Sequence, residues 1–248
     1  MRKILIVLGI VVVAAAAGWA VVEFRPSNKS VPPFPSPTSF KDAPVLPVTI
    51  TADDRWIGKA DAPVTIVEYA SLTCPHCAHF DVDVLPAVKP VLIDSGKVRL
   101  VYRDYPLDGL ALRAAKMVRC AGPERTFGFL DLLFSRQTSW IKDDLPSSVA
   151  ALATLARQGG MSESEFNACM ANESLQNAVA QSRIEAEKVY KIDSTPSFLI
   201  NGRLIVGAPQ PEELIALVDS LLPGASNAAV PVPPTGPSTT SPPSSPQR

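Results

Sequence analysis

Two cysteines separated by two residues are the part of this chain whose residue types and spacing most directly indicate chemistry. Cys74 and Cys77 enclose Pro75 and His76, and they follow an apolar, β-branched run that begins at Val64. Such a run predicts a strand that delivers the first cysteine to the start of a helix. The N-terminus of a helix carries about half a positive charge and unpaired N–H groups, which stabilise a thiolate. We therefore interpret Cys74 as the attacking sulfur and Cys77 as its resolving partner in dithiol–disulfide chemistry.

The same residues allow other chemistry, which the spacing disfavours. Covalent haem attachment needs a histidine directly after the second cysteine, and Ala78 stands there. A zinc site could draw on Cys74, Cys77, His76 and His79. Structural zinc sites, however, usually take their second pair of ligands from further along the chain. A purely structural disulfide is the remaining alternative, and we expect no metal and no cofactor.

The elements around the motif predict how it is positioned. Residues 64–69 read as a central strand, and a helix begins at about residue 74. Pro86 and Pro90 are expected to kink or break that helix. Residues 98–102 alternate apolar and polar side chains, as a second strand would. Strand, helix and strand at this spacing form a βαβ unit, which predicts a parallel pair with a right-handed crossover.

The rest of the domain is expected to add helices and then a hairpin. Residues from about 110 to 190 show helical spacing throughout, including a capping box formed by Ser162 and Glu165. Asn201-Gly202 between two apolar runs predicts a β-hairpin with a two-residue turn. A last helix is expected from Pro211 to about residue 222. Residues 48–51 are expected to form a short edge strand, and residues 55–63 a loop.

The two ends of the chain differ in composition from this domain. Residues 4–22 carry no charge over nineteen positions and follow Arg2 and Lys3, a pattern that predicts a membrane anchor within residues 1–25. A cleaved signal peptide is the alternative, and both readings export the domain to an oxidising compartment. Residues 26–47, with seven prolines, predict an extended linker, and residues 223–248, with eight, predict a disordered tail.

Charge and length narrow the function further. The 248 residues carry a net charge of −1, which gives no electrostatic case for binding nucleic acid or an anionic membrane surface. The compact part, about 48–222, is long enough for one core with an inserted subdomain at about 110–190. We therefore expect an α/β domain of the order βαβ, helical insert, ββα.

These features together resemble the thioredoxin superfamily, and more closely its exported DsbA-like branch. The resemblance covers roughly residues 53–222 and rests on four stretches: Cys74–Cys77, Thr195-Pro196 before a strand, residues 61–68 ahead of the motif, and Asn201-Gly202. A Cys-x-x-Cys motif alone would be far less specific. The resemblance implies a thioredoxin-like fold with an inserted α-helical subdomain, and it implies that Thr195-Pro196 is a cis bond that faces the dithiol.

Several residues receive expected roles beside the two motif cysteines. His76 is expected to donate a hydrogen bond or place positive charge beside the Cys74 sulfur, and Pro75 to fix the turn. Glu68 is expected to be partly buried and to exchange a proton with Cys77, although an exposed strand position is the alternative. The backbone of Thr195, before Pro196, is expected to pair with an extended substrate segment. His79 is interpreted as a surface or packing residue.

Two further cysteines, Cys120 and Cys169, fall in the helical insert. In an oxidising compartment we expect them to form a structural disulfide between two helices. Two buried free thiols and a second redox-active pair are the alternatives that the sequence leaves open.

The favoured function is an exported thiol:disulfide oxidoreductase that introduces or exchanges disulfide bonds in secreted or periplasmic proteins. Its expected partners are reduced or unfolded exported proteins and a membrane redox partner, here a quinone-linked oxidase. The expected location is the periplasmic side of the cytoplasmic membrane, or the soluble periplasm if the N-terminal segment is cleaved. A disulfide isomerase or reductase that uses the same dithiol is one alternative. A non-catalytic anchored chaperone with this fold is the other.

Overall fold

The computed structural model describes residues 33–224. The predicted anchor (1–25), the first part of the predicted linker (26–32) and most of the predicted tail (225–248) lie outside the described residues. Among the residues that are described, no helix combines the length and apolar character needed to cross a bilayer.

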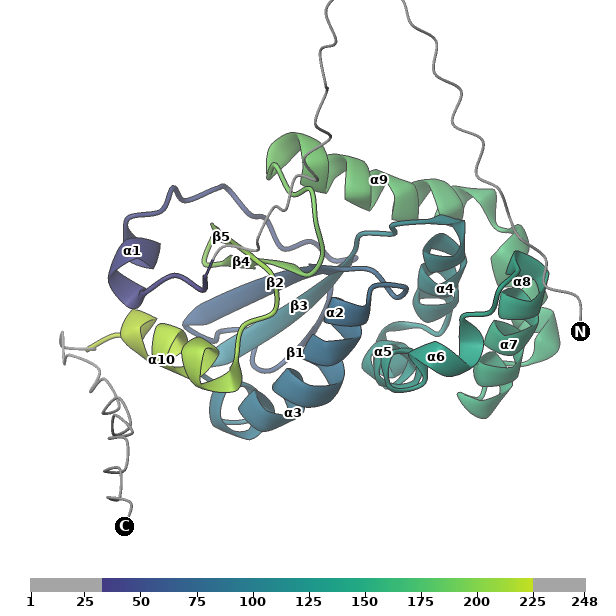
Figure 1. Cartoon of the computed structure of the whole chain (residues 1–248), viewed down its shortest axis with the longest axis horizontal. Helices are drawn as coiled ribbons and strands as arrows, with labels where there is room; N and C mark the ends of the chain where they lie inside the picture. Colours follow the sequence, from purple (N-terminus) through teal and green to yellow (C-terminus); the bar gives the residue numbers. More distant parts are fainter. Residues whose placement is uncertain (1–32, 225–248) are drawn as a thin grey trace, which may run out of the picture. The chain divides into compact units, whose positions relative to one another are not determined.

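A five-stranded mixed sheet organises the domain in the order β1-β3-β2-β4-β5 (Figure 1). The strands are β1 (Arg55–Ile57), β2 (Val64–Ala70), β3 (Val98–Asp104), β4 (Ser197–Ile200) and β5 (Arg203–Val206). Strands β2 and β3 are parallel, and every other neighbouring pair is antiparallel. The parallel pair and the Asn201-Gly202 hairpin are therefore as predicted, and both turn residues have the positive φ angles, 44° and 81°, that such a turn requires.

One continuous helical run connects β2 to β3. It consists of α2 (Pro75–His79), a π-type segment (Phe80–Val84), α3 (Leu85–Val88) and a second π-type segment (Lys89–Ile93). The sequence predicts that Pro86 and Pro90 kink or break this helix. They do not break it, because the helical run continues past both prolines. A wider π-type turn accompanies each of them, which is how helices commonly absorb a missing N–H and a crowded ring.

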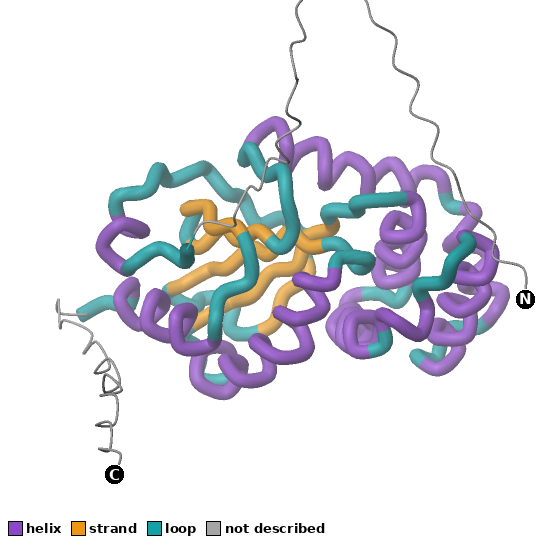
Figure 2. Tube along the Cα trace, viewed as in Figure 1, coloured by secondary structure: helices purple, strands orange, loops and turns teal. Residues whose placement is uncertain are grey.

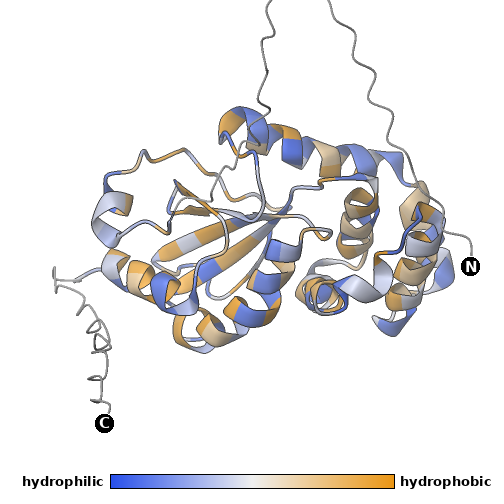
Figure 3. Cartoon of the chain, viewed as in Figure 1, coloured by the Kyte–Doolittle hydropathy of each residue, from blue (hydrophilic) through white to orange (hydrophobic). Residues whose placement is uncertain are grey.

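Only helices and loops lie between β3 and β4, so the predicted helical insert is confirmed (Figure 2). Its α-helices are α4 (Gly109–Cys120), α5 (Thr126–Ser135), α6 (Gln137–Trp140), α7 (Leu145–Gln158), α8 (Glu163–Ala171) and α9 (Glu173–Val189). The capping box of Ser162 and Glu165 opens α8, as predicted. Hydrophobic residues prevail along α5 and hydrophilic ones along α9, in keeping with their different burial (Figure 3).

Alternating side chains on the strands pack against different layers. Ile66 and Leu100 face α3 and the last helix, α10 (Pro211–Leu221), in one apolar cluster. Val67 and Val101 face the opposite side, where α9 contributes Ala186 to a second cluster. The sheet is thus covered on both faces, as expected for strands that read as near-continuous apolar runs.

Residues 33–47, the described part of the predicted extended linker, fold onto this domain, so that prediction is wrong for them. Residues 37–41 form the short helix α1, whose Phe40 is buried in the same cluster as α10. Val48 and Ile50 belong to no strand, and pack against the sheet face instead of extending its edge. The predicted edge strand at 48–51 is therefore wrong, and β1, inside the predicted loop 55–63, takes that role. Apolar and polar residues alternate at 48–51. This alternation fits both a strand at the edge of the sheet and a segment packed on its face, so the sequence cannot distinguish the two arrangements.

Candidate active site

The Cys-x-x-Cys motif lies where β2 ends and α2 begins. Cys74 is the N-cap of α2, with an extended backbone (φ −83°, ψ 122°), and Pro75 occupies the first helical position, where its missing N–H costs nothing. Cys74 is 6% exposed, whereas Cys77, one turn into the helix, is completely buried. The cysteine at the helix start is therefore the more accessible sulfur, and the second lies beneath it.

The environment of Cys74 favours its thiolate. The pKa of Cys74 is lowered to about 5, chiefly by the hydrogen bond that the Cys77 thiol offers to its sulfur. Burial opposes this shift, but the Thr195 side chain and the backbone N–H groups of Cys77 and His76 also lower the pKa. The N-terminal N–H groups of the helix thus act on the sulfur as the sequence predicts, while the ring of His76 itself is exposed.

Cys77 and Glu68 lie in a contrasting environment. Burial raises the pKa of Cys77 well above its usual value, and the nearby charges of Cys74 and Glu68 act in the same direction. Glu68 is 4% exposed and stands between Tyr102 and Phe198 in the sheet. Its Oε1 is buried and has no hydrogen-bond partner within residues 33–224, and burial raises the pKa of Glu68 well above normal. Glu68 is thus a buried acid whose charge acts on Cys77, and the exposed alternative is excluded.

The segment before β4 faces the first cysteine across 121 positions of sequence. The Thr195-Pro196 bond is cis, and the Sγ of Cys74 donates a hydrogen bond to the carbonyl oxygen of Thr195 at 3.4 Å. The Thr195 Oγ1 atom is buried, and it has no hydrogen-bond partner among the described residues while Cys74 is a thiol. The carbonyl and the hydroxyl of Thr195 therefore both lie at the Cys74 sulfur.

Sequence reasoning missed the residues that hold the turn in front of Cys74. Thr73 donates a hydrogen bond to the carboxylate of Asp108 at 2.8 Å, and Asp108 also caps α4. Gln137 from α6 donates to the carbonyl oxygens of Leu72 at 2.9 Å and Cys74 at 3.0 Å. Asp108 could have been found as an N-cap from its place before an apolar helix. Nothing in the local sequence marks Gln137, because its partners lie more than sixty positions away.

The remaining two cysteines are joined in a disulfide. Cys120, at the end of α4, is bonded to Cys169 in α8, with a Cα–Cα distance of 6.1 Å. Cys74 and Cys77 are free, so the chain holds one bonded pair of cysteines in the insert and one free pair at the start of α2.

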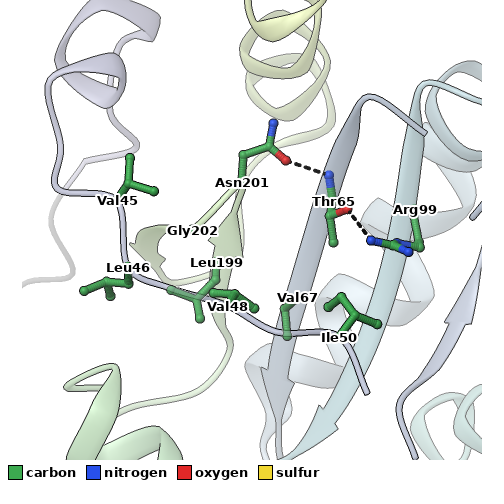
Figure 4. Close-up of a pocket in the computed structure, with 10 residues that line it drawn as sticks. All are labelled: Val45, Leu46, Val48, Ile50, Thr65, Val67, Arg99, Leu199, Asn201 and Gly202. Atoms are coloured by element: carbon green, nitrogen blue, oxygen red, sulfur yellow. Dashed lines mark hydrogen bonds between the residues drawn. The ribbon is translucent and has the colours of Figure 1, made fainter. Parts of the chain in front are cut away.

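A cavity of about 350 Å³ lies elsewhere, between residues 45–50 and the sheet (Figure 4). It is bounded by Leu199, the hairpin turn and Arg99, whose guanidinium donates to the Thr65 hydroxyl at 3.0 Å. No residue of the motif lines it, so it does not belong to the dithiol site. Within residues 33–224, no group of three or more His, Cys, Asp or Glu side chains is placed to hold a metal ion.

Comparison with known proteins agrees with this geometry. A family model described as thioredoxin matches residues 51–220, which is more than half of the chain. A protein of Rickettsia bellii named "Putative protein-disulfide oxidoreductase" is 29% identical over 154 residues, which are 62% of this chain and 59% of the relative. The chain thus spans less than two thirds of the length of that relative.

Solved structures give the same result. The crystal structure of Wolbachia pipientis alpha-DsbA1 has 28% sequence identity and a TM-score of 0.66, covering 70% of this chain and 93% of its own. BdbD from Bacillus subtilis, in its oxidised form, shares the fold with a TM-score of 0.63 at 21% identity, over 72% of this chain and 96% of its own. The chain therefore belongs to the thioredoxin family, and within that family it is similar to the DsbA-like proteins.

Proposed function

We propose that this chain is a protein thiol:disulfide oxidoreductase that exchanges disulfide bonds through Cys74 and Cys77. The observation that carries the proposal is the contrast between the two sulfurs. Cys74 has a pKa of about 5 at the start of a helix, whereas Cys77 is buried and its pKa is raised. A low pKa stabilises the reduced form, so the disulfide is readily given up to a substrate.

The reaction moves two electrons from substrate to protein. A substrate thiolate attacks the Cys74 sulfur of the disulfide form, which creates a mixed disulfide and breaks the bond to Cys77. The departing Cys77 thiolate takes a proton from Glu68, the buried acid whose charge reaches it. A second substrate thiolate then attacks the substrate sulfur of the mixed disulfide. This step releases the oxidised substrate and leaves Cys74 as a thiolate.

Thr195 and Pro196 are the proposed substrate-binding residues. The backbone of Thr195 lies within hydrogen-bond distance of Cys74, where an extended segment carrying the reacting sulfur must pass. Such a segment can pair with the peptide groups of Thr195 in the manner of an added strand. Hydrogen bonds between backbone groups do not depend on the side chains of the substrate, which suits an enzyme that acts on many reduced proteins.

The proposed setting is an exported compartment. The disulfide between Cys120 and Cys169 supports it, since such bonds persist mainly in oxidising compartments. The positively charged start and apolar run of residues 1–25 support export and an attachment to the membrane. After each cycle the dithiol must be reoxidised, and we propose a quinone-linked membrane oxidase as the partner that accepts its electrons.

The test is oxidative folding of a reduced, unfolded substrate protein by the oxidised chain. Cys74→Ser is expected to abolish the reaction. Cys77→Ser keeps only the Cys74 thiolate, and it is expected to trap a mixed disulfide when it is given a substrate that already carries a disulfide, because the displaced substrate thiolate leaves and no Cys77 thiol is present to resolve the product. A Cys120→Ala/Cys169→Ala double variant is the control, because it removes the other cysteine pair and should keep the reaction. Ultraviolet titration that places the Cys74 pKa near the ordinary value of about 8.5 would contradict the proposal.

A further inference from the structure

Gln137, a side chain of the helical insert, donates hydrogen bonds to two backbone carbonyls, one shortly before Cys74 and one of Cys74 itself. The amide nitrogen of Gln137 donates to the Leu72 carbonyl oxygen at 2.9 Å and to the Cys74 carbonyl oxygen at 3.0 Å. A side-chain amide carries two N–H donors, so a single group can serve both carbonyls. Leu72 is 1% exposed, and a buried carbonyl of this kind needs such a partner.

The position of Gln137 is fixed by the core of the insert. It begins α6, a single turn that ends at Trp140. The indole of Trp140 is fully buried and donates to the Leu133 carbonyl oxygen at 2.8 Å. Trp140 shares one apolar cluster with both motif cysteines and with α4, α5 and α7. The amide of Gln137 is therefore presented to the motif from a rigid support.

The two contacted carbonyls belong to the turn that orients the Cys74 sulfur. The N–H of Cys74 donates to the Ser71 carbonyl oxygen at 3.0 Å, and the carbonyl of Cys74 accepts the Ala78 N–H at 3.1 Å. These bonds make Cys74 the N-cap, with its sulfur over the N–H groups of His76 and Cys77. Gln137 adds two bonds to the same turn and brings the positive end of its amide to it.

We propose that Gln137 is a positioning residue for Cys74, through which the helical insert sets the ionisation of the reactive sulfur. The inference rests on the proposed function and adds a residue to it. The insert then contributes to the chemistry itself. Its apolar core fixes α6, and the Gln137 amide at the start of α6 orients the first turn of α2. Gln137 touches neither substrate nor sulfur in this role, because it acts through the backbone of Leu72 and Cys74.

The experiment compares the pKa of Cys74 in the reduced full-length protein, by ultraviolet titration of the thiolate, with three variants. Gln137→Met keeps the size of the side chain and removes both donors. Gln137→Asn keeps the amide on a shorter side chain, which cannot span both carbonyls. Gln158→Ala is the matched control: Gln158 is an exposed residue of the same insert, and it bonds to Arg136 at 2.8 Å instead of to the motif.

We expect Gln137→Met to raise the Cys74 pKa by about one unit, the size appropriate to one or two neutral hydrogen bonds. The equilibrium of the dithiol with glutathione should shift up to about tenfold toward the disulfide in the same variant. Gln137→Asn should give a smaller change in the same direction, and it carries the test if the Met variant does not fold. Gln158→Ala should have the same Cys74 pKa as the wild-type protein.

The inference is overturned if Gln137→Met lowers the melting temperature but leaves the Cys74 pKa unchanged, because the contact is then merely stabilising. It is also overturned if Gln158→Ala moves the pKa as far as Gln137→Met. In both cases the unchanged protein still has a low pKa, so the proposed function stands. A pKa near about 8.5 in the unchanged protein removes the proposed function and this inference together.

Discussion

Glu68 is a carboxylic acid at a strand position whose neighbours on the same sheet face are apolar. Its pKa is raised well above normal, chiefly by burial and also by the charge of Asp81. Folding therefore makes Glu68 bind a proton more tightly, and its contribution to stability is fully present below its unfolded pKa of about 4.3. That contribution is lost as the pH rises toward the raised value in the folded state. The buried acid that we propose as the proton donor to Cys77 therefore destabilises the fold at neutral pH.

Glu68→Gln is expected to stabilise the oxidised protein at pH values well above about 4.3, because the neutral amide has no charge to bury. The gain should shrink as the pH falls toward that value, where the unfolded carboxyl also becomes protonated. Urea unfolding at several pH values measures this difference. Glu124→Gln is the matched control at an exposed position, and should show no such trend. Equal gains at all pH values would contradict a buried, protonated Glu68.

Thr195 offers a second test at the residue scale. Its hydroxyl lowers the pKa of Cys74, and its buried oxygen has no hydrogen-bond partner among the described residues. Thr195→Val keeps the shape of the side chain and removes the hydroxyl, so the Cys74 pKa should rise by about one unit. Thiolate titration measures the change, with Thr138→Val at an exposed position as the control. An unchanged pKa would mean that the hydroxyl does not reach the thiolate.

The local parts of the site could be predicted from the sequence, whereas its tertiary contacts could not. Cys74 at a helix start follows from a strand, a turn and a proline that are adjacent in the chain. The burial of Glu68 follows from its place in β2, a strand of largely apolar residues that is covered on both faces. Gln137 reaches the motif only because α6 is placed by the packing of Trp140, and no spacing rule carries that information.

Among the elements, the β4–β5 hairpin also anchors the N-terminal segment. Gly202, with φ +81°, occupies the second turn position, and its carbonyl accepts the Leu46 N–H at 2.8 Å. A Cβ atom at Gly202 would lie 2.5 Å from the Leu46 carbonyl oxygen. The Asn201-Gly202 signal predicted the turn correctly, but not that a segment 156 positions earlier would cross it, because a turn motif describes only its own two strands.

Gly202→Ala is therefore expected to destabilise the domain by about 1–3 kcal/mol, through the strained φ and the clash with the segment around Leu46. Gly128→Ala is the matched control, since Gly128 lies in α5 and an added Cβ would have nothing within 4 Å besides its chain neighbours and the backbone of its own helix. That change should stabilise the helix by roughly 0.5–1 kcal/mol. Chemical denaturation of both variants measures the contrast, and a stable Gly202→Ala protein would show that the crossing segment is free to move away.

On the scale of the whole molecule, the apolar clusters do not follow the division into sheet and insert. Cys74 and Cys77 lie in the same cluster as α4, α5 and α7, whereas most of the sheet packs in two other clusters. The order of strands and helices predicted a thioredoxin-like sheet with a separate helical insert. It could not predict that the dithiol belongs to the core of the insert, because element order says nothing about which faces meet. A loss of packing in the insert should therefore also loosen the packing around Cys74 and Cys77.

The disulfide between Cys120 and Cys169 tests that connection. It closes a loop of 49 positions inside the insert, which in the chain-entropy model stabilises the folded state by about 4 kcal/mol. Cys120→Ala/Cys169→Ala should lower the free energy of unfolding by about 2–4 kcal/mol. Because the insert and the dithiol share a core, far- and near-ultraviolet circular dichroism should still report one coincident transition. Two separate transitions would show that the insert unfolds independently, and that the dithiol draws no support from it.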